Sequence, residues 1–254
     1  MTGPLVTAVR TLTLLPVPGK DTPVFTRAFW FFPVAGALLS AVAYGLCAGA
    51  AFLFPEQPWL SALLLATVLI WLTGALHLDG LADVADGFGG GRTRARILEI
   101  MKDPCQGTFG VAAIALDLML KTGLYCALIM EAALLPILAS LVLSRAFQPL
   151  FMAASPYARP EGGTGQGFCG DASSRPAALF SAAIVTAMLF YALPLPHALA
   201  FSLTAFTVML AVTALCRRKL GGITGDCIGA CSELIEIAVL LAGVILMNRL
   251  PGGQ

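Results

Sequence analysis

Three aspartates with helical spacing stand at the end of an apolar stretch. The segment from His77 to Gly87 reads HLDGLADVADG and contains Asp79, Asp83 and Asp86. On an α-helix, residues at i, i+4 and i+7 lie on one face. Three like charges there repel one another, so we expect cations to neutralise them, and oxygen-only ligands suit hard cations such as Mg²⁺ or Mn²⁺. The spacing predicts a divalent-metal site at a membrane surface, suited to binding phosphates.

A second charged segment follows a run of three glycines. Residues 92–103 read RTRARILEIMKD, an amphipathic helical pattern whose charged stripe contains Arg92, Arg96, Glu99 and Asp103. A solvated face held by salt bridges would give the same pattern. Next to the three aspartates, however, we expect Glu99 and Asp103 to complete a two-metal site. Arg92 and Arg96 would then neutralise a phosphate.

Glycine-rich loops supply further candidate binding groups. Gly107 and Gly110 open an apolar stretch, and exposed amides at a helix start favour anions. A later loop, GGITGDCIGA, carries Asp226, and Glu233 and Glu236 follow it at the next helix start. Acidic groups there could simply stabilise the helix dipole. Three of them after a glycine-rich turn favour one wall of a binding pocket.

Two other features each allow two interpretations. The glycines of the loop at 155–176 suit a substrate-covering segment with Arg159, Asp171 and Arg175 as contacts, and a plain connector explains them equally well. His77 could be a general base or a hydrogen-bonded structural group. The residues expected to contact substrate are His77, Arg92, Arg96, Lys102, Gly107, Asp226 and Glu233.

The composition restricts the class of protein. Of the 254 residues, 58% are hydrophobic and 11% are charged, and the mean hydropathy is +0.88. Soluble domains carry about 25% charged residues, so the chain is predicted to be a single membrane-embedded domain over residues 1–254. A net charge of +1 gives no basis for nucleic-acid binding. The seven cysteines form no CxxC pair and are expected to be packing residues.

Seven apolar stretches are long enough to cross a bilayer, which takes about 20 residues. The predicted spans are residues 31–54, 59–78, 108–130, 133–153, 177–193, 197–216 and 232–249. The segment through Pro18 predicts a short interfacial helix. Asp117 and Lys121, four residues apart within one span, are expected to pair, and Arg145 is a third intramembrane charge. The expected fold is an all-α polytopic helical bundle with about seven transmembrane helices plus interfacial helices.

The distribution of basic residues predicts the orientation. Twelve of the 15 lysines and arginines lie on the side of the N-terminus, which the positive-inside rule assigns to the cytoplasm. The C-terminus is then outside. The outer loops are short, whereas every glycine-rich or acidic stretch is cytoplasmic. A transporter needs polar groups along its path across the bilayer, so this one-sided arrangement favours an enzyme with cytoplasmic substrates.

Together these motifs resemble one family. HLDGLADVADG, RILEIMKD, GTFG and GGITGDCIGA, with the N-terminal LTLLPVPG, look like the cobalamin synthases, the adenosylcobinamide-GDP ribazoletransferases. The resemblance covers nearly the whole chain and is most specific at residues 77–110. It implies that adenosylcobinamide-GDP and α-ribazole, or its 5′-phosphate, give adenosylcobalamin, or its 5′-phosphate, and GMP. It also implies dependence on Mg²⁺ and a location in the bacterial inner membrane.

The chemistry is also similar to that of the CDP-alcohol phosphotransferases, whose motif runs DxxDGxxAR, then G, then DxxxD. Asp83 and Asp86 match its beginning. Two glycines at 90–91 replace its Ala-Arg pair, and the segment from Glu99 to Asp103 is the nearest analogue of DxxxD. The resemblance therefore implies a related fold with an altered second half of the site.

The expected mechanism is attack of a ribose hydroxyl on the diphosphate, assisted by two divalent metal ions. The metal ligands expected are Asp79, Asp83, Asp86 and Asp103, with Glu99 as a further catalytic candidate. Asp103 or another carboxylate near the metal would accept the hydroxyl proton. A homo-oligomer, or contacts with other enzymes of cobalamin synthesis, is left open.

Two alternative functions remain at this point. A CDP-alcohol phosphotransferase of phospholipid synthesis would share the metal chemistry but release CMP. A transporter of a phosphorylated solute would move its substrate into vesicles without forming GMP.

Overall fold

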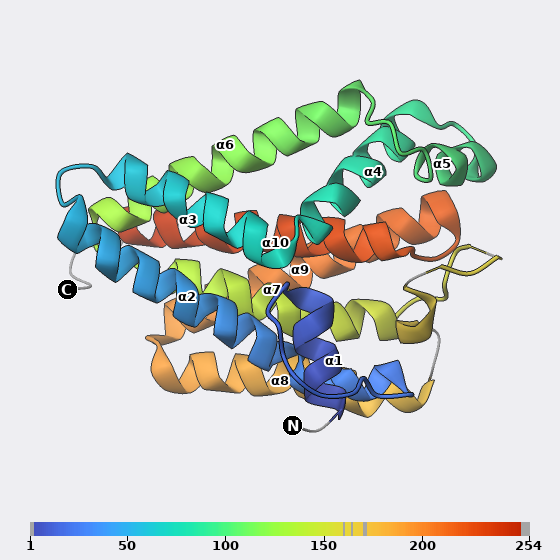
Figure 1. Cartoon of the computed structure of the whole chain (residues 1–254), viewed down its shortest axis with the longest axis horizontal. Coiled ribbons are helices and arrows are strands. Elements are labelled where there is room, and N and C mark those ends of the chain that lie inside the picture. The colour runs from blue at the N-terminus through green and yellow to red at the C-terminus, as the bar shows by residue number, and fades with distance from the viewer. Residues whose placement is uncertain (1–2, 160, 164, 170–171, 250–254) are drawn as a thin grey trace.

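The computed structural model describes residues 3–159, 161–163, 165–169 and 172–249, which form a bundle of packed helices (Figure 1). Its α-helices are α1 (Gly3–Leu12), α2 (Phe32–Leu53), α3 (Pro58–Thr73), α4 (Leu76–Gly90), α5 (Arg94–Ile100), α6 (Thr108–Met130), α7 (Leu135–Ala153), α8 (Arg175–Ala192), α9 (Leu195–Leu220) and α10 (Gly225–Arg249). The short 3₁₀ helices are η1 (Phe25–Phe31), η2 (Gln166–Phe168) and η3 (Ala172–Ser174). The described residues include no strand, so the all-α prediction is confirmed.

The apolar helices confirm a multi-pass membrane protein. Among the described residues, six helical segments are long and apolar enough to cross a bilayer, and the bent pair α3–α4 would make a seventh. Helix α6 occupies the predicted span at 108–130. Helix α10 begins at Gly225, well before the span predicted from residue 232. Asp226 and two glycines lower the mean hydropathy of its first two turns, so a hydropathy criterion places the start of the span too late.

The second span was predicted as one continuous helix at 59–78, and the structure breaks it in two. Helix α3 ends at Thr73 after 16 residues, and the chain bends by 88° into α4. At the bend, Gly74 and Ala75 have left-handed φ values of 62° and 55°. A 16-residue helix is about 24 Å long, which is shorter than the ~30 Å hydrocarbon core of a bilayer. The aspartates therefore lie on a separate helix rather than at the end of a continuous span.

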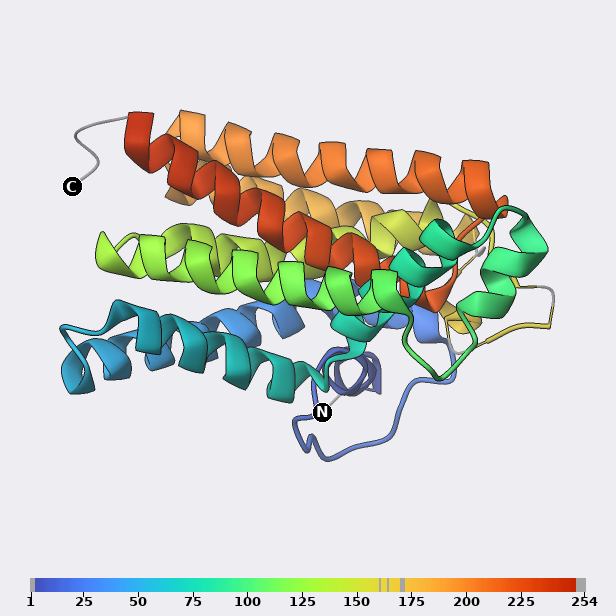
Figure 2. The same cartoon turned by 90° about the horizontal axis from the view of Figure 1, so that it is seen from above.

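The polar loops gather at one end of the bundle. Figures 1 and 2 show the α4–α5 region, the α7–α8 loop and the α9–α10 turn at one end, opposite the α2–α3 and α6–α7 connections. Two of these loops are joined directly, because Tyr157 and Ile223 form an isolated bridge and the Ala158 N–H donates to the Ile223 carbonyl at 2.7 Å. The bundle therefore has one end with long polar loops and one end with short connections, as the distribution of loops in the sequence predicted.

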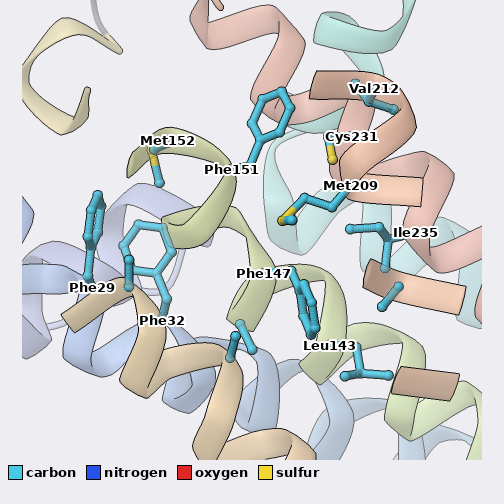
Figure 3. Close-up of a cluster of buried hydrophobic side chains, with 14 of the residues drawn as sticks. Phe29, Phe32, Leu143, Phe147, Phe151, Met152, Met209, Val212, Cys231 and Ile235 are labelled. Atoms are coloured by element: carbon cyan, nitrogen blue, oxygen red, sulfur yellow. The ribbon is translucent and has the colours of Figure 1, made fainter. Parts of the chain in front are cut away.

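Helix α7 lies in the centre of the apolar core. Its side chains Leu143, Phe147 and Phe151 belong to one buried cluster with Met209 of α9 and Ile235 of α10 (Figure 3). The peripheral helices instead turn large apolar side chains outward, a distribution that suits contact with lipid. The outward-facing examples with the highest exposure on α6 and α8 are Met119, at 72%, and Tyr191, at 95%.

Two glycines allow α4 and α10 to approach closely. A Cβ atom on Gly80 would lie 2.7 Å from the carbonyl oxygen of Asp226, and one on Gly229 would lie 3.0 Å from the Cα of His77. Side chains at either position would push the two backbones apart. The close contact between α4 and α10 therefore requires glycine at these positions, and it brings the aspartates of α4 near Asp226.

Alanine at Gly80 is expected to lower the free energy of unfolding by about 1–3 kcal/mol, the usual effect of overpacking. The matched control is Gly45→Ala on α2, where a Cβ meets nothing within 4 Å. That control is expected to gain up to about 1 kcal/mol from helix propensity. Thermal unfolding of both variants in detergent measures the difference. Equal stabilities would contradict the close α4–α10 contact.

Candidate active site

The contact between α4 and α10 brings three carboxylates together at the polar end. Asp79 and Asp226 both lie close enough to Asp83 to repel its carboxylate electrostatically. We call these three residues the carboxylate cluster. Asp79 is exposed, and the other two are half-buried. The sequence predicted two members of the cluster as metal ligands and the third as a substrate contact.

Arg159 holds the third carboxylate in place. Its Nη2 donates to Oδ2 of Asp226 at 2.7 Å and to the carbonyl of Met101 at 3.2 Å. The Thr224 hydroxyl donates to the same Asp226 oxygen at 3.1 Å. The guanidinium therefore pairs with Asp226, and the three carboxylates of the cluster outnumber this one cation.

Asp86 contacts the beginning of α6. It is 8% exposed and accepts the N–H groups of Gly107 at 2.7 Å and Gly110 at 2.8 Å. A Cβ on Gly107 would lie 2.5 Å from an oxygen of Asp86, so glycine is needed there. The anion expected at this helix start is thus a side chain of the same protein. Each oxygen of Asp86 keeps a second lone pair, and its role as a metal ligand stays a prediction.

The second charged segment forms a shorter helix than predicted. Helix α5 begins at Arg94, where Thr93 caps it, and ends at Ile100. Arg92 and Asp103 lie outside it, so the four charged residues do not form one helical stripe. The Thr93 cap and the proline at position 104 explain these boundaries.

The charged side chains of this region are exposed, and several of them have partners. Arg96 pairs with Glu99 at 2.9 Å, and Asp103 accepts the Cys105 N–H at 2.9 Å. Lys102 pairs with Glu161 of the α7–α8 loop. The solvated salt-bridged face considered for this segment accounts for the Arg96–Glu99 pair, and the catalytic and substrate roles remain predictions.

The α7–α8 loop folds over the same end of the bundle. Besides Arg159, it is tied down by Arg94, which donates to the Ala158 carbonyl at 2.8 Å. Arg175 begins α8 and is exposed. Asp171, another expected contact, lies outside the described residues. Arg159 is therefore the residue of this loop that the structure brings to the carboxylate cluster.

Glu233 does not join the carboxylate cluster. Lys121 forms ion pairs with Glu233, with Glu236 at 2.8 Å and with Asp117 at 3.7 Å. Arg145 pairs with Glu236 as well. We call these five residues the intramembrane charge network. The expected Asp117–Lys121 pair is confirmed, whereas Asp226 and Glu233, expected in one wall, line different cavities.

A cavity of about 180 Å³ adjoins the carboxylate cluster. We call it the His77 cavity, and it is bounded by Thr11, Leu12, Phe32, Leu76, His77, Asp79, Gly80, Gln148, Met152, Gly165, Phe168, Gly225, Asp226, Ile228 and Gly229. Sequence reasoning missed Gln148, which lies within a predicted span, and Phe168, an apolar residue of the glycine-rich loop at 155–176. They are brought here by α7 and by the α7–α8 loop.

The donor set suits a hard divalent cation. The cluster offers carboxylate oxygens, which Mg²⁺ and Mn²⁺ prefer, and its excess negative charge favours a cation. Among the described residues, no three acidic, histidine or cysteine side chains are arranged to hold a metal ion as they stand.

Comparison with known proteins identifies relatives along the whole chain. A family model described as cobalamin-5-phosphate synthase matches residues 4–244. Proteins named adenosylcobinamide-GDP ribazoletransferase from Chlorobium chlorochromatii and Chlorobaculum tepidum are 41% and 42% identical over 253 residues, with 98% of each chain covered. One with the same name from Syntrophobacter fumaroxidans is 40% identical over 94% of this chain and 97% of its own. No solved structure matches the chain.

Proposed function

This chain belongs to the cobalamin-5-phosphate synthase family, and we propose that it joins adenosylcobinamide-GDP to α-ribazole, or to α-ribazole 5′-phosphate, with release of GMP. Relatives that bear the name of this transferase align with the chain over nearly their full length. One structural observation carries the proposed chemistry: Asp79, Asp83 and Asp226 gather at the polar end of a membrane bundle, next to a cavity.

The reaction exchanges one phosphorus–oxygen bond for another. The oxygen of a ribose hydroxyl forms a bond with the phosphorus that carries the cobinamide. The bond from that phosphorus to the bridging oxygen breaks, and GMP leaves with the electron pair. The hydroxyl proton passes to a carboxylate of the site, which must lie within hydrogen-bond reach of that hydroxyl.

The cluster would hold the metal ion through Asp79, Asp83 and Asp226, with Asp86 and Asp103 as further candidate ligands. When bound, Mg²⁺ would neutralise the diphosphate and stabilise the leaving oxygen. Arg159 fixes Asp226 and, as a fork of donors beside the cluster, suits contact with a phosphate oxygen. Glu99 remains a candidate at the rim.

We place this site on the cytoplasmic face of the inner membrane. The excess of Lys and Arg at the polar end supports that orientation. Soluble nucleotide substrates would then reach the carboxylate cluster without crossing the bilayer. The enzyme could act as a monomer or an oligomer, alone or beside other enzymes of cobalamin synthesis.

Removal of divalent metal is expected to abolish transfer. Purified protein in detergent would receive adenosylcobinamide-GDP, α-ribazole and Mg²⁺, and chromatography would follow cobalamin and GMP. We expect the two products in equal amounts, none of either with EDTA, and recovery when excess Mg²⁺ is restored.

Two results would contradict the proposal in different ways. Undiminished transfer in EDTA would remove the metal from the mechanism but keep the reaction. No product from folded protein, together with CMP release from a CDP-activated alcohol, would favour the phospholipid phosphotransferase instead.

A further inference from the structure

The His77 cavity has the size of a single ring system. Its volume is about 180 Å³. An apolar cavity of about 150 Å³ accommodates a benzene molecule, and pockets for whole drug-sized ligands measure about 300–1,000 Å³. A corrin macrocycle is therefore far too large for this cavity. Because Asp79 and Asp226 line it, a ligand inside would present its remaining atoms to the carboxylate cluster.

Most side chains around the cavity are apolar, and the apolar ones come from six separate elements. They are Leu12, Phe32, Leu76, Met152, Phe168 and Ile228. Phe168 is 9% exposed, and its ring lies 6.2 Å from that of Phe32, centroid to centroid. Such walls favour a flat apolar ring, since aromatic faces and edges pack well against one another.

His77 places one hydrogen-bond donor in this apolar surrounding. Its Nε2 lies 3.0 Å from Nε2 of Gln148, which also donates to the Ser232 hydroxyl at 3.0 Å. An amide nitrogen donates only, so Nε2 of His77 must accept. The neutral imidazole then carries its proton on Nδ1, and the neighbours of the ring fix this tautomer.

The Nδ1 atom of His77 has no partner among the described residues. His77 is one of the residues around the cavity and is 3% exposed, and its Nδ1 is itself buried. A buried donor without an acceptor costs about 1–3 kcal/mol, and such groups in native proteins usually have a partner. A ligand with an acceptor atom would supply one.

We propose that the His77 cavity binds the aromatic base of the acceptor nucleoside and that His77 Nδ1–H donates to the free ring nitrogen of that base. The assignment rests on the proposed function, in which the acceptor is α-ribazole. Its base is a benzimidazole: one ring nitrogen carries the ribose, and the other has a lone pair in the ring plane. One acceptor therefore meets one donor, and the remaining ring carbons meet apolar walls.

The guanine of the other substrate fits this cavity less well. Guanine carries several donors and acceptors around its edge. Besides His77, the polar side chains of the cavity are Thr11, Asp79, Gln148 and Asp226, and edge groups that face the apolar side chains instead would stay unpaired at a cost in free energy. With benzimidazole in the cavity, the ribose lies beside Asp79 and Asp226. The attacking hydroxyl is then delivered to the cluster that would bind the diphosphate.

The test compares two ligands with three proteins. The ligands are α-ribazole and its indole analogue, in which a C–H replaces the free ring nitrogen. The proteins are the wild type, His77→Phe, which keeps a ring but removes the donor, and His77→Asn, whose amide nitrogen can donate from near the position of Nδ1. His197→Phe, at the opposite end of the bundle, is the matched control.

Wild-type protein is expected to prefer α-ribazole over the indole analogue about 10-fold in KM, the effect of one buried hydrogen bond. In His77→Phe the KM for α-ribazole should rise about 10-fold and the preference should vanish, whereas the KM for adenosylcobinamide-GDP stays within about twofold. His77→Asn should restore part of the preference. A merely structural role for His77 would alter both substrates or neither.

Calorimetric binding of both ligands to EDTA-treated protein separates this proposal from the proposed function. Selective binding of α-ribazole that is lost in His77→Phe supports the cavity assignment even where transfer fails. A His77→Phe protein that keeps the wild-type preference overturns the assignment while transfer by the wild type stands. Absence of both transfer and α-ribazole binding overturns both proposals.

Discussion

Replacing Asp83 with asparagine is expected to reduce transfer about 100- to 1,000-fold, the usual effect of losing one group that stabilises charge in a transition state, without loss of stability. In the wild type, Gln106 Nε2 donates to Asp83 Oδ1 at 3.3 Å, and asparagine keeps an oxygen that can accept the same hydrogen bond. It removes one of three mutually repelling charges. The folded protein should therefore be at least as stable as the wild type.

A loss of transfer without a loss of stability distinguishes a functional role of Asp83 from a structural one. A residue that only supports packing loses stability and activity together, whereas a residue strained for function can gain stability when it is removed. Steady-state transfer and thermal unfolding in detergent without added metal give the two values. Glu131→Gln, which neutralises an exposed carboxylate after α6, serves as the charge control and should change neither.

Asp86 provides a contrast on the same helix face. Its carboxylate accepts two backbone N–H groups at the beginning of α6, so its neutralisation weakens a helix cap as well as a candidate metal ligand.

Activity retained in Asp83→Asn at the wild-type level would exclude the Asp83 carboxylate from the metal site. The proposed chemistry would then have to rest on other carboxylates.

Much of this site could be predicted from local sequence because helical periodicity is a local property. The spacing of Asp79, Asp83 and Asp86 correctly predicted a helix, and the glycine run correctly predicted its end. The bend at Gly74 was missed because glycine is common in membrane helices and a glycine within an apolar run leaves the hydropathy high. The predicted boundaries of the spans agree with the helices where polar loops flank them, whereas the predicted start of α10 is too late.

The contacts that the sequence did not indicate join distant segments. No local pattern indicates that Asp86 will accept amides from the beginning of α6, because the same aspartate could equally face a metal ion. Likewise, Glu233 shares a helix with Asp226, yet it pairs with Lys121 on α6. Partner choice within a membrane bundle is set by which helices pack together, and the sequence contains that information only through the complete fold.

Replacing Lys121 with methionine is expected to destabilise the protein by about 3–5 kcal/mol, the usual cost of leaving a buried charge without its partner. Lys121 is 8% exposed and pairs with Glu233, Glu236 and Asp117. Methionine has a similar length and fills the space, so the change removes charge more than volume. The variant would be measured by thermal unfolding in detergent and by the yield of folded protein.

The intramembrane charge network explains why the effect should be large. Three carboxylates face two cations, so the network has a formal excess of one negative charge, and the substitution raises this formal excess to two. Both oxygens of Asp117 already lack a hydrogen-bond partner among the described residues. Arg145 still pairs with Glu236 in the variant, whereas Glu233 and Asp117 both lose their ion pair with Lys121.

A double variant separates charge from shape. Adding Glu233→Gln to Lys121→Met restores the wild-type excess of charge, and replacing both members of a buried pair is often close to neutral in stability. We therefore expect the double variant to recover most of the loss. Arg96→Met breaks an exposed pair with Glu99 and should cost less than about 1 kcal/mol. If the double variant unfolds as easily as Lys121→Met, volume and not charge holds α6 against α10.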